Sequence, residues 1–501
     1  MGVMTELRQR STELTDLNNI LALMQWDQEV QMPAAAGAER ASQFAALSTV
    51  IHRQEVDPTL GELLQAARAL AGLTDADQAL VRVMQRNYDQ NTKLPEKFVA
   101  ELARLTSQAL PVWIEARQAA DFKRFAPHLA RLVEMARQKA TYLGFANEPY
   151  DALLDLHEEG LLTSEVERIF SELQEPLVAM LAEARSGRAP AWQLPADLEL
   201  AAQIKFAEQV LAKIGYDFTR GRQDLSTHPF TTSLGHNDRR LTNRYQPRSL
   251  EFIFSALHEG GHGLYEQGIA AELAHSHLDT GVSLGIHESQ SRLWENIIGR
   301  SRPFWENFYP ALQQAFPAFK ALAVTDFLAV INRVQPGPIR VEADEVSYNL
   351  HILIRFELER GLLAGRLEVG DLPDFWNDKY RRYLGVVVDS PAQGVLQDIH
   401  WAHGSFGYFP TYTIGNLAAA QFWQAYCRFD PDHEQTVRAG ELHKIRAWLT
   451  DHIYRHGAVL PPALLIERVT GQKLTGRYFM DYLQNKYAGL VQNPAAGRRQ
   501  N

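Results

Sequence analysis

Apolar residues recur at helical spacing along almost all of this 501-residue chain, and that periodicity is the strongest constraint on its fold. From Thr5 to about Gln54 they follow a three- and four-residue spacing, interrupted mainly at Pro33 and Gly37. The same pattern occupies residues 75–90, 95–118, 124–143 and 163–186. No fixed-period repeat accompanies it, which argues against a solenoid. We therefore predict a mainly α-helical protein.

Two stretches interrupt the helical pattern. Residues 186–198 are rich in Gly, Ala and Pro, which predicts a loop and a candidate subdomain boundary within a single domain spanning 1–501. Residues 226–247 are rich in Thr, Phe, Tyr and Asn around a Gly-His-Asn-Asp turn. That composition predicts a short hairpin or one small antiparallel sheet beside the helix that follows.

Composition limits the classes of binding partner and the cellular compartment that we expect for this protein. The formal net charge is −10 and is spread without long like-charged runs, which argues against a nucleic-acid or anionic-membrane partner. The only cysteine, Cys427, cannot form an internal disulfide and fits a reducing compartment. The N-terminus lacks the apolar segment of a signal peptide, and no apolar run is long enough to span a bilayer. We expect a cytoplasmic protein that binds neither nucleic acid nor membrane.

The segment from Ser249 to Gly268 carries a metal-binding pattern on a predicted amphipathic helix, with Ser249 as its expected N-cap. His258 and His262 are four residues apart, so both imidazoles lie on the same side of that helix, one turn apart. Two imidazoles so placed can bind one tetrahedral zinc ion, with Glu259 beside the open coordination position. The alternative is a pair of histidines with purely structural partners.

A catalytic zinc site needs a third protein ligand. Tyr265 stands where the extended HExxHxxGxxH motif requires glycine, which excludes that arrangement. Glu266 and Glu272 are poor candidates, because they lie on the same helix or just beyond its end. Glu288 opens a new amphipathic stretch, HESQSRLWENIIGR, and is the favoured third ligand. Its alternative role is to stabilise the first turn of that helix.

Other candidates in this region are weaker. We interpret His275, His277 and His287 as surface or supporting histidines rather than ligands. The stretch from Gly281 to Gly285 matches the G-x-S-x-G pattern of serine hydrolases, but no strand-like segment precedes it, so Ser283 is a poor nucleophile candidate.

Six ordered motifs extend the argument over the whole chain. They are HPF at 228–230, D-x-R-x-T at Asp238, Arg240 and Thr242, HEGGH at 258–262, HESQS at 287–291, IRVEAD at 339–344 and GVLQDIHW at 394–401. With them the chain resembles the carboxypeptidase Taq family of metallocarboxypeptidases, also called thermostable carboxypeptidase 1.

The resemblance implies several further properties. It implies release of single residues from the free C-termini of peptides with broad specificity, a zinc cofactor that Co²⁺ can replace, and a homodimer. It also implies a helical body divided by a deep active-site groove, similar to neurolysin. His258, His262 and Glu288 match the positions that bind metal in the family, and Glu259 matches the catalytic base.

The groups that stabilise the oxyanion and hold the substrate are less constrained. The candidate oxyanion donors are His400, Tyr408 and Tyr412, although a buried tyrosine is commonly just a packed core residue. A free carboxylate suits the planar fork of arginine, which makes Arg240 and Arg355 the candidates.

Each of these groups also has a structural alternative. Either arginine can instead form an internal ion pair, for Arg355 with Glu359. The remaining substrate-binding candidates are His228, Asp238, Thr242 and Asp398. Asp238 could orient Arg240 or cap a turn, and Asp398 could support His400 or a metal ligand. His228 is either a groove residue or a turn histidine.

Two competing functions share these residues. An endo-acting oligopeptidase would use the same metal site but would also cleave peptides blocked at the C-terminus. A non-catalytic helical binding protein would keep a structural zinc with four protein ligands, and Glu259 beside the site argues against it.

Overall fold

The structure, a computed structural model, describes residues 2–185 and 197–491. The chain divides into two compact units. Unit 1 comprises Met1–Thr92, Trp192–Leu328 and Phe422–Lys473, and unit 2 comprises Lys93–Ala191, Ala329–Gln421 and Leu474–Asn501. The subdomain boundary predicted near 186–198 falls almost wholly on residues outside the described ones, so it stays a prediction.

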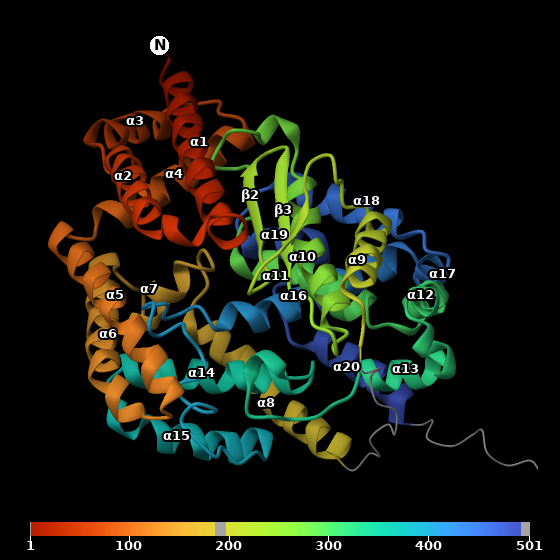
Figure 1. Cartoon of the computed structure of the whole chain (residues 1–501). Helices are drawn as coiled ribbons and strands as arrows, with labels where there is room; N and C mark the ends of the chain where they lie inside the picture. The colour runs from red at the N-terminus through yellow and green to blue at the C-terminus, as the bar shows by residue number, and fades with distance from the viewer. Residues whose placement is uncertain (1, 186–196, 492–501) are drawn as a thin grey trace, which may run out of the picture. The chain divides into compact units, whose positions relative to one another are not determined.

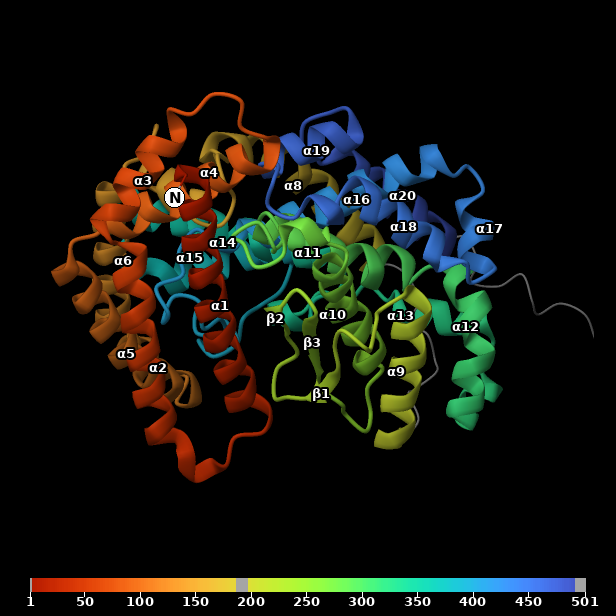
Figure 2. The same ribbon diagram turned by 90° about the horizontal axis from the view of Figure 1, so that it is seen from above.

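Unit 1 contains the predicted sheet and the predicted metal helix. Its elements are α1 (Val3–Val30), α2 (Gly37–Glu55), α3 (Pro58–Arg68), α4 (Asp75–Thr92), α9 (Leu200–Ile214), β1 (Gln223–Leu225), β2 (Thr231–Gly235), β3 (Asp238–Asn243), α10 (Glu251–Gln267), α11 (Leu284–Arg292), α12 (Arg302–Ala315), α17 (His433–Arg438), α18 (Leu442–His452) and α19 (Pro462–Thr470). Helix α10 packs against α9, α11 and the sheet (Figures 1 and 2). Ile253, Leu257 and Leu264 are buried along it, so α10 lies in the core of this unit.

Unit 2 is helical among its described residues. Its elements are α5 (Glu96–Gln118), α6 (Phe122–Leu143), α7 (Pro149–Asp155), α8 (Thr163–Arg185), α14 (Ser347–Leu363), α15 (Leu372–Lys379) and α20 (Arg477–Val491). Helices α13 (Val324–Ile331) and α16 (Pro410–Phe429) include residues of both units. Helix α14 is buried along most of its length, including charged residues such as Arg355 and Glu359, as expected of a helix at the centre of a unit.

Short turns of other helix types complete the fold. The 3₁₀ turns are Ala34–Ala36, Ala271–Leu273, Pro317–Ala321, Arg340–Glu342, Val369–Asp371 and Tyr454–His456, and the π-helical turns are η3 (Leu293–Ile298) and η7 (Tyr380–Leu384). Within 2–185 and 197–491, no helix is both long enough and apolar enough to cross a membrane.

The predicted mainly helical fold with a small sheet is confirmed. The patterns at 75–90, 95–118, 124–143 and 163–186 correspond to α4, α5, α6 and α8. The start of α10 differs by one position, because Leu250 rather than Ser249 is its N-cap. The Ser249 hydroxyl still accepts a hydrogen bond from the Glu251 backbone N–H at 3.0 Å, so it satisfies one of the unpaired donors of the first turn.

The sheet is mixed rather than wholly antiparallel, which corrects the prediction in part. Strands β2 and β3 pair antiparallel across a tight turn, whereas β1 pairs parallel to β3 on its other edge. The connection from β1 to β2, residues 226–230, must therefore cross the end of β3. The Thr242 hydroxyl holds this crossing: it lies 2.7 Å from the Ser226 hydroxyl and accepts from the Phe230 backbone N–H at 2.9 Å.

Candidate metal centre

Two glycines in the HEGGH motif let α10 pack closely against its neighbours. A Cβ atom on Gly261 would lie 2.5 Å from the backbone oxygen of Gln290 and 2.7 Å from Cα of Ser291, both in α11. A Cβ atom on Gly260 would instead meet a methyl group of Leu211 in α9 at 2.5 Å. Only glycine at position 261 therefore allows the backbone of α11, and with it Glu288, to lie this close to the histidines.

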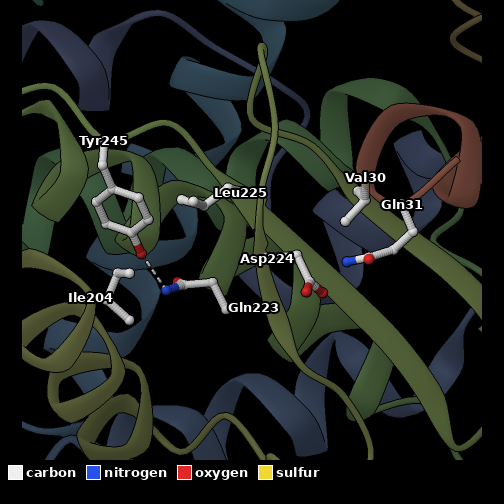
Figure 3. Close-up of a pocket in the computed structure, with 7 residues that line it drawn as sticks. All are labelled: Val30, Gln31, Ile204, Gln223, Asp224, Leu225 and Tyr245. Atoms are coloured by element: carbon white, nitrogen blue, oxygen red, sulfur yellow. Dashed lines mark hydrogen bonds between the residues drawn. The ribbon is translucent and has the colours of Figure 1, made fainter. Parts of the chain in front are cut away.

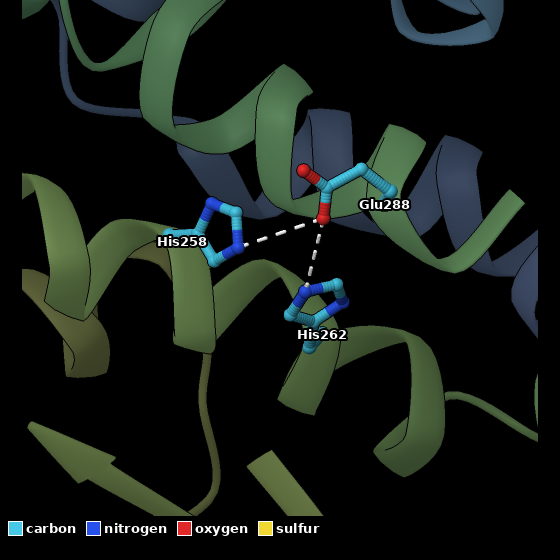
Figure 4. Close-up of side chains that lie close together, drawn as sticks. All are labelled: His258, His262 and Glu288. Atoms are coloured by element: carbon cyan, nitrogen blue, oxygen red, sulfur yellow. Dashed lines mark ion pairs between the residues drawn. The ribbon is translucent and has the colours of Figure 1, made fainter. Parts of the chain in front are cut away.

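Helix α11 begins earlier than the sequence pattern indicated. It starts at Leu284, and Ser283 is its N-cap, with the side chain accepting from the Ile286 backbone N–H at 3.1 Å. Capping a helix accounts for Ser283 without any nucleophilic role. Glu288 consequently lies in the second turn of α11, and its carboxylate faces α10 (Figure 4).

The three predicted ligands converge on one point (Figure 4). Nε2 of His258 lies 3.6 Å from Oε2 of Glu288, and Nε2 of His262 lies 3.5 Å from the same oxygen. All three ligand atoms lie within 4.8 Å of one another. Tetrahedral zinc with bonds of about 2.0–2.1 Å places neighbouring ligands about 3.3 Å apart, so the spacing suits one ion.

The outer nitrogens of both histidines are occupied, which leaves the inner nitrogens for a metal. Nδ1 of His258 lies 2.9 Å from Oε2 of Glu295, and Nδ1 of His262 lies 2.6 Å from Nδ1 of His287. Glu295 belongs to the π-helical turn η3 that continues α11. Two imidazoles and one carboxylate, each with a supporting partner, form the donor set typical of catalytic zinc.

The charges around the cluster keep Glu288 ionised. Burial raises the pKa of this carboxyl, but Arg292, whose Nε lies 2.7 Å away, and the neighbouring histidines outweigh burial and hold the pKa well below its usual range. Burial lowers the pKa of His262 to about 3, so this imidazole is neutral at pH 7. An ionised carboxylate and a neutral imidazole are the states that bind metal.

Glu259 points from the same helix toward strand β2. Its Oε2 accepts a hydrogen bond from the Thr231 hydroxyl at 2.7 Å, and its side chain is buried. Burial raises the pKa of this carboxyl above its ordinary value, and the Glu288 and Glu295 carboxylates raise it further against opposing effects of His258 and Thr231. A carboxylate with a raised pKa takes up a proton more readily, as a general base must.

We predict that Gly261→Ala weakens metal binding more than Gly260→Ala does. The new methyl at 261 meets backbone atoms of α11 and must displace Glu288, whereas at 260 it meets the end of a leucine side chain. Both changes should cost about 1–3 kcal/mol of stability through overpacking. Zinc titration against a chelator measures the difference, and equal metal affinities in the two variants would contradict this account.

The sheet positions the predicted residues Asp238 and Arg240 as an ion pair within β3. Arg240 Nε and Nη2 lie 2.8 and 2.7 Å from the two oxygens of Asp238, and the guanidinium lies over the ring of Trp26 at 4.2 Å. The Arg240 side chain keeps 18% of its surface exposed. His228 is exposed in the 226–230 connection, in which the Ser226 hydroxyl lies 2.7 Å from the Thr242 hydroxyl.

Unit 2 gathers the predicted residues Arg355 and Asp398 around a second buried charge cluster. Arg355 is fully buried, and its Nη2 lies 2.7 Å from Oδ2 of Asp398. Arg340 pairs with the other oxygen of Asp398 at 2.8 Å. The ion-pair partner of Arg355 is thus Asp398 rather than Glu359, whose carboxylate accepts from Trp401 and Tyr150 at 2.8 Å each.

The three candidate oxyanion donors lie together in unit 2. Nε2 of His400 is 3.2 Å from the Tyr412 hydroxyl, and the His400 ring packs against the Tyr408 ring at a centroid distance of 5.3 Å. Asp398 does not orient His400 through a hydrogen bond, since Nδ1 of His400 has no such partner among the described residues. Burial lowers the pKa of His400 to about 3, which keeps this imidazole neutral.

Three residues of these clusters were missed from the sequence. Thr231 and Glu295 showed no signal, because each acts on a residue that is distant along the chain. Arg340 stood within the IRVEAD motif, and that motif was the usable sign. His275 and His277, as expected, bind elsewhere: they contact Asp16 and Ser11 of α1.

A cavity of 340 Å³ lies in unit 1 (Figure 3). It is lined by Val30, Gln31, Ile204, Gln223, Asp224, Leu225 and Tyr245, from α1, α9 and the outer strand β1 with its surroundings. None of the candidate site residues lines it.

Comparisons with known proteins agree over nearly the full length of the chain. The family model described as "Carboxypeptidase Taq (M32) metallopeptidase" matches residues 6–487. Thermostable carboxypeptidase 1 of Thermus thermophilus is 41% identical, covering 95% of this chain and 97% of its own. Carboxypeptidase 1 of Bacillus subtilis is 38% identical, covering 95% and 96%. The solved M32 carboxypeptidase of Deinococcus radiodurans R1 superposes with a TM-score of 0.96 at 38% identity, covering 98% of this chain and 100% of that one.

Proposed function

This chain belongs to the carboxypeptidase Taq (M32) family and is a metallocarboxypeptidase, and we propose that it is a zinc enzyme of broad specificity with Glu259 as its general base. The observation that carries the proposal is the convergence of His258, His262 and Glu288 beside Glu259. Two imidazoles and a carboxylate favour zinc over harder cations, which prefer oxygen ligands. Co²⁺ should replace zinc in the same donor set.

Glu259 moves the protons of the reaction. Bound zinc would supply Lewis-acid activation of a water molecule and of the scissile carbonyl. The Thr231 hydroxyl holds Oε2 of Glu259 in place. The other oxygen takes the proton of the attacking water and delivers it to the leaving amine, so that the C–N bond breaks to give a carboxylate and a free amino acid.

We assign stabilisation of the oxyanion to His400 or Tyr412, with Tyr408 packing against both rings. The support is chemical: a neutral imidazole and a tyrosine hydroxyl lie in mutual contact, and either group can donate a hydrogen bond to an oxyanion. Replacing the hydroxyl, as in Tyr412→Phe, separates a donor role from packing of the ring.

Recognition of the substrate carboxylate falls to Arg240 rather than Arg355 in this proposal. Arg240 keeps part of its guanidinium exposed and is oriented by Asp238, whereas Arg355 is fully buried and committed to Asp398. His228 and Thr242 shape the connection above β3, and Asp398 holds the arginine pair of unit 2.

A pair of peptides tests whether the enzyme requires a free C-terminus. The free acid should be cleaved one residue at a time, and the C-terminal amide of the same sequence should be cleaved at least about 100-fold more slowly, because a lost charge-assisted pair costs roughly 3 kcal/mol. Arg240→Ala should raise KM for the free acid and leave the amide unchanged. Equal rates on the two peptides would instead identify an endo-acting oligopeptidase.

The remaining properties are proposals of the same kind. We propose a homodimer, which sedimentation of the purified protein would test, and a cytoplasmic location, for which the support is the single cysteine. The proposed substrates are peptides, with no nucleic-acid or membrane partner. Metal analysis of the purified enzyme would identify the native ion.

A further inference from the structure

The two histidine ligands are supported in different ways. His258 contacts a carboxylate directly, since its Nδ1 lies 2.9 Å from Glu295. His262 has no carboxylate at its Nδ1, which faces Nδ1 of His287 at 2.6 Å. His287 in turn places its Nε2 2.9 Å from Oε1 of Glu266. A second imidazole thus stands between this ligand and a buried carboxylate.

The geometry allows one assignment of protons along the hydrogen-bonded series His262–His287–Glu266. A metal at Nε2 of His262 requires the proton of that ring to be on Nδ1, which then donates to Nδ1 of His287. His287, accepting at Nδ1, carries its own proton on Nε2 and donates to Glu266. Every nitrogen has one role, and the neutral tautomer of His287 acts as both acceptor and donor.

Glu266, the last group of this hydrogen-bonded series, is itself held by several partners. It is one turn beyond His262 on α10, and its side chain is only 3% exposed. Arg239 lies 3.0 Å from Oε2, and the Ser233 hydroxyl donates to the same oxygen at 2.8 Å. The Gly281 backbone N–H donates to Oε1 at 2.9 Å. The carboxylate is therefore held from strands β2 and β3, from the loop at Gly281 and, through His287, from α11.

The loop above His287 also restrains its ring. A Cβ atom on Gly281 would lie 2.6 Å from Cδ2 of His287 and 2.8 Å from a ring carbon of Tyr265. Position 281 thus allows the backbone to cover the imidazole directly. The His287 ring is enclosed between that backbone, the Tyr265 ring and His262.

We propose that His287 is a positioning residue that couples the metal ligand His262 to the buried carboxylate of Glu266, fixing the tautomer and the orientation in which His262 binds metal. The proposal rests on the metal site assigned above and adds a residue outside its ligand set. Supporting groups of this kind typically change metal affinity about 10–100-fold.

The test compares His287→Met with His287→Gln, two side chains of similar length. Glutamine can accept from His262 with its amide oxygen and donate to Glu266 with its amide nitrogen, whereas methionine has only a weak acceptor and no donor. We expect His287→Met to raise the Kd for Zn²⁺ about 10–100-fold and His287→Gln to recover most of that loss. Competition with a chromophoric chelator, without peptide, measures Kd, and thermal unfolding of the metal-free proteins measures stability.

Controls separate this role from a structural one. His275→Met alters an exposed histidine near the same loop and should leave the Kd for Zn²⁺ unchanged. If His287→Met does not fold, Gly281→Ala takes its place, because the new methyl displaces the His287 ring while keeping its chemistry. An unchanged Kd for Zn²⁺ in the folded variant, or glutamine no better than methionine, overturns the proposal. Failure of the wild-type enzyme to cleave free-acid peptides would count against the proposed function alone.

Discussion

Glu259→Gln is expected to lower kcat about 10²–10⁴-fold while the protein keeps its metal. The change replaces a carboxylate by an amide of the same size, which can still accept from Thr231 but has no oxygen basic enough to take a proton. The proposed ligands His258, His262 and Glu288 are untouched, so metal content should match the wild type. Steady-state kinetics on a free-acid peptide, with metal analysis of the same samples, measures both quantities.

A glutamate elsewhere on α10 provides the matched control for this experiment. Glu251 is exposed in the first turn, and Glu251→Gln should retain wild-type kcat. A wild-type rate in metal-loaded Glu259→Gln protein would show that another group moves the proton. Loss of metal in that variant would instead mean that Glu259 supports the ligand geometry, and the kinetic comparison would then need the metal-saturated protein.

Asp398→Asn is expected to destabilise the protein by about 3–5 kcal/mol. This carboxylate is the shared partner of Arg340 and Arg355, whose side chains are 7% and 0% exposed, so the change leaves two buried guanidinium groups without a counter-charge. Chemical denaturation at pH 7 measures the loss. Asp389→Asn, an exposed position on the preceding loop, should lie within about 0.5 kcal/mol of wild type.

The pH dependence of that difference checks its electrostatic origin. Burial raises the pKa of Asp398, but Arg340 and Arg355 outweigh burial and hold the pKa below its usual range. A carboxyl with a lowered folded-state pKa stabilises the protein above its unfolded pKa of about 3.9 and loses that contribution as the pH falls. The difference in unfolding free energy between wild type and Asp398→Asn should therefore become smaller below about pH 4. A constant difference would point to a packing effect.

Local periodicity made most of the fold predictable. Helix α10 was located to within two residues because four-residue spacing of His258 and His262 and the surrounding apolar face are properties of a single helix. The hairpin β2–β3 was also foreseen, because a tight turn joins its strands. The parallel partner β1 was not, since its pairing depends on a connection that crosses β3 and is closed by the Thr242 hydroxyl.

The sequence by itself determined the helical class, the metal helix and, through the amphipathic stretch after it, the candidate third ligand Glu288. Only the tertiary structure decided which side chains support these groups: Glu295 and His287 behind the histidines, Thr231 on Glu259, and Asp398 between two arginines. The physical reason is the separation along the sequence of the residues that interact. Helical spacing is set by bonds within one turn, whereas these partners meet because buried charges and hydrogen-bonding groups must be paired when distant segments pack.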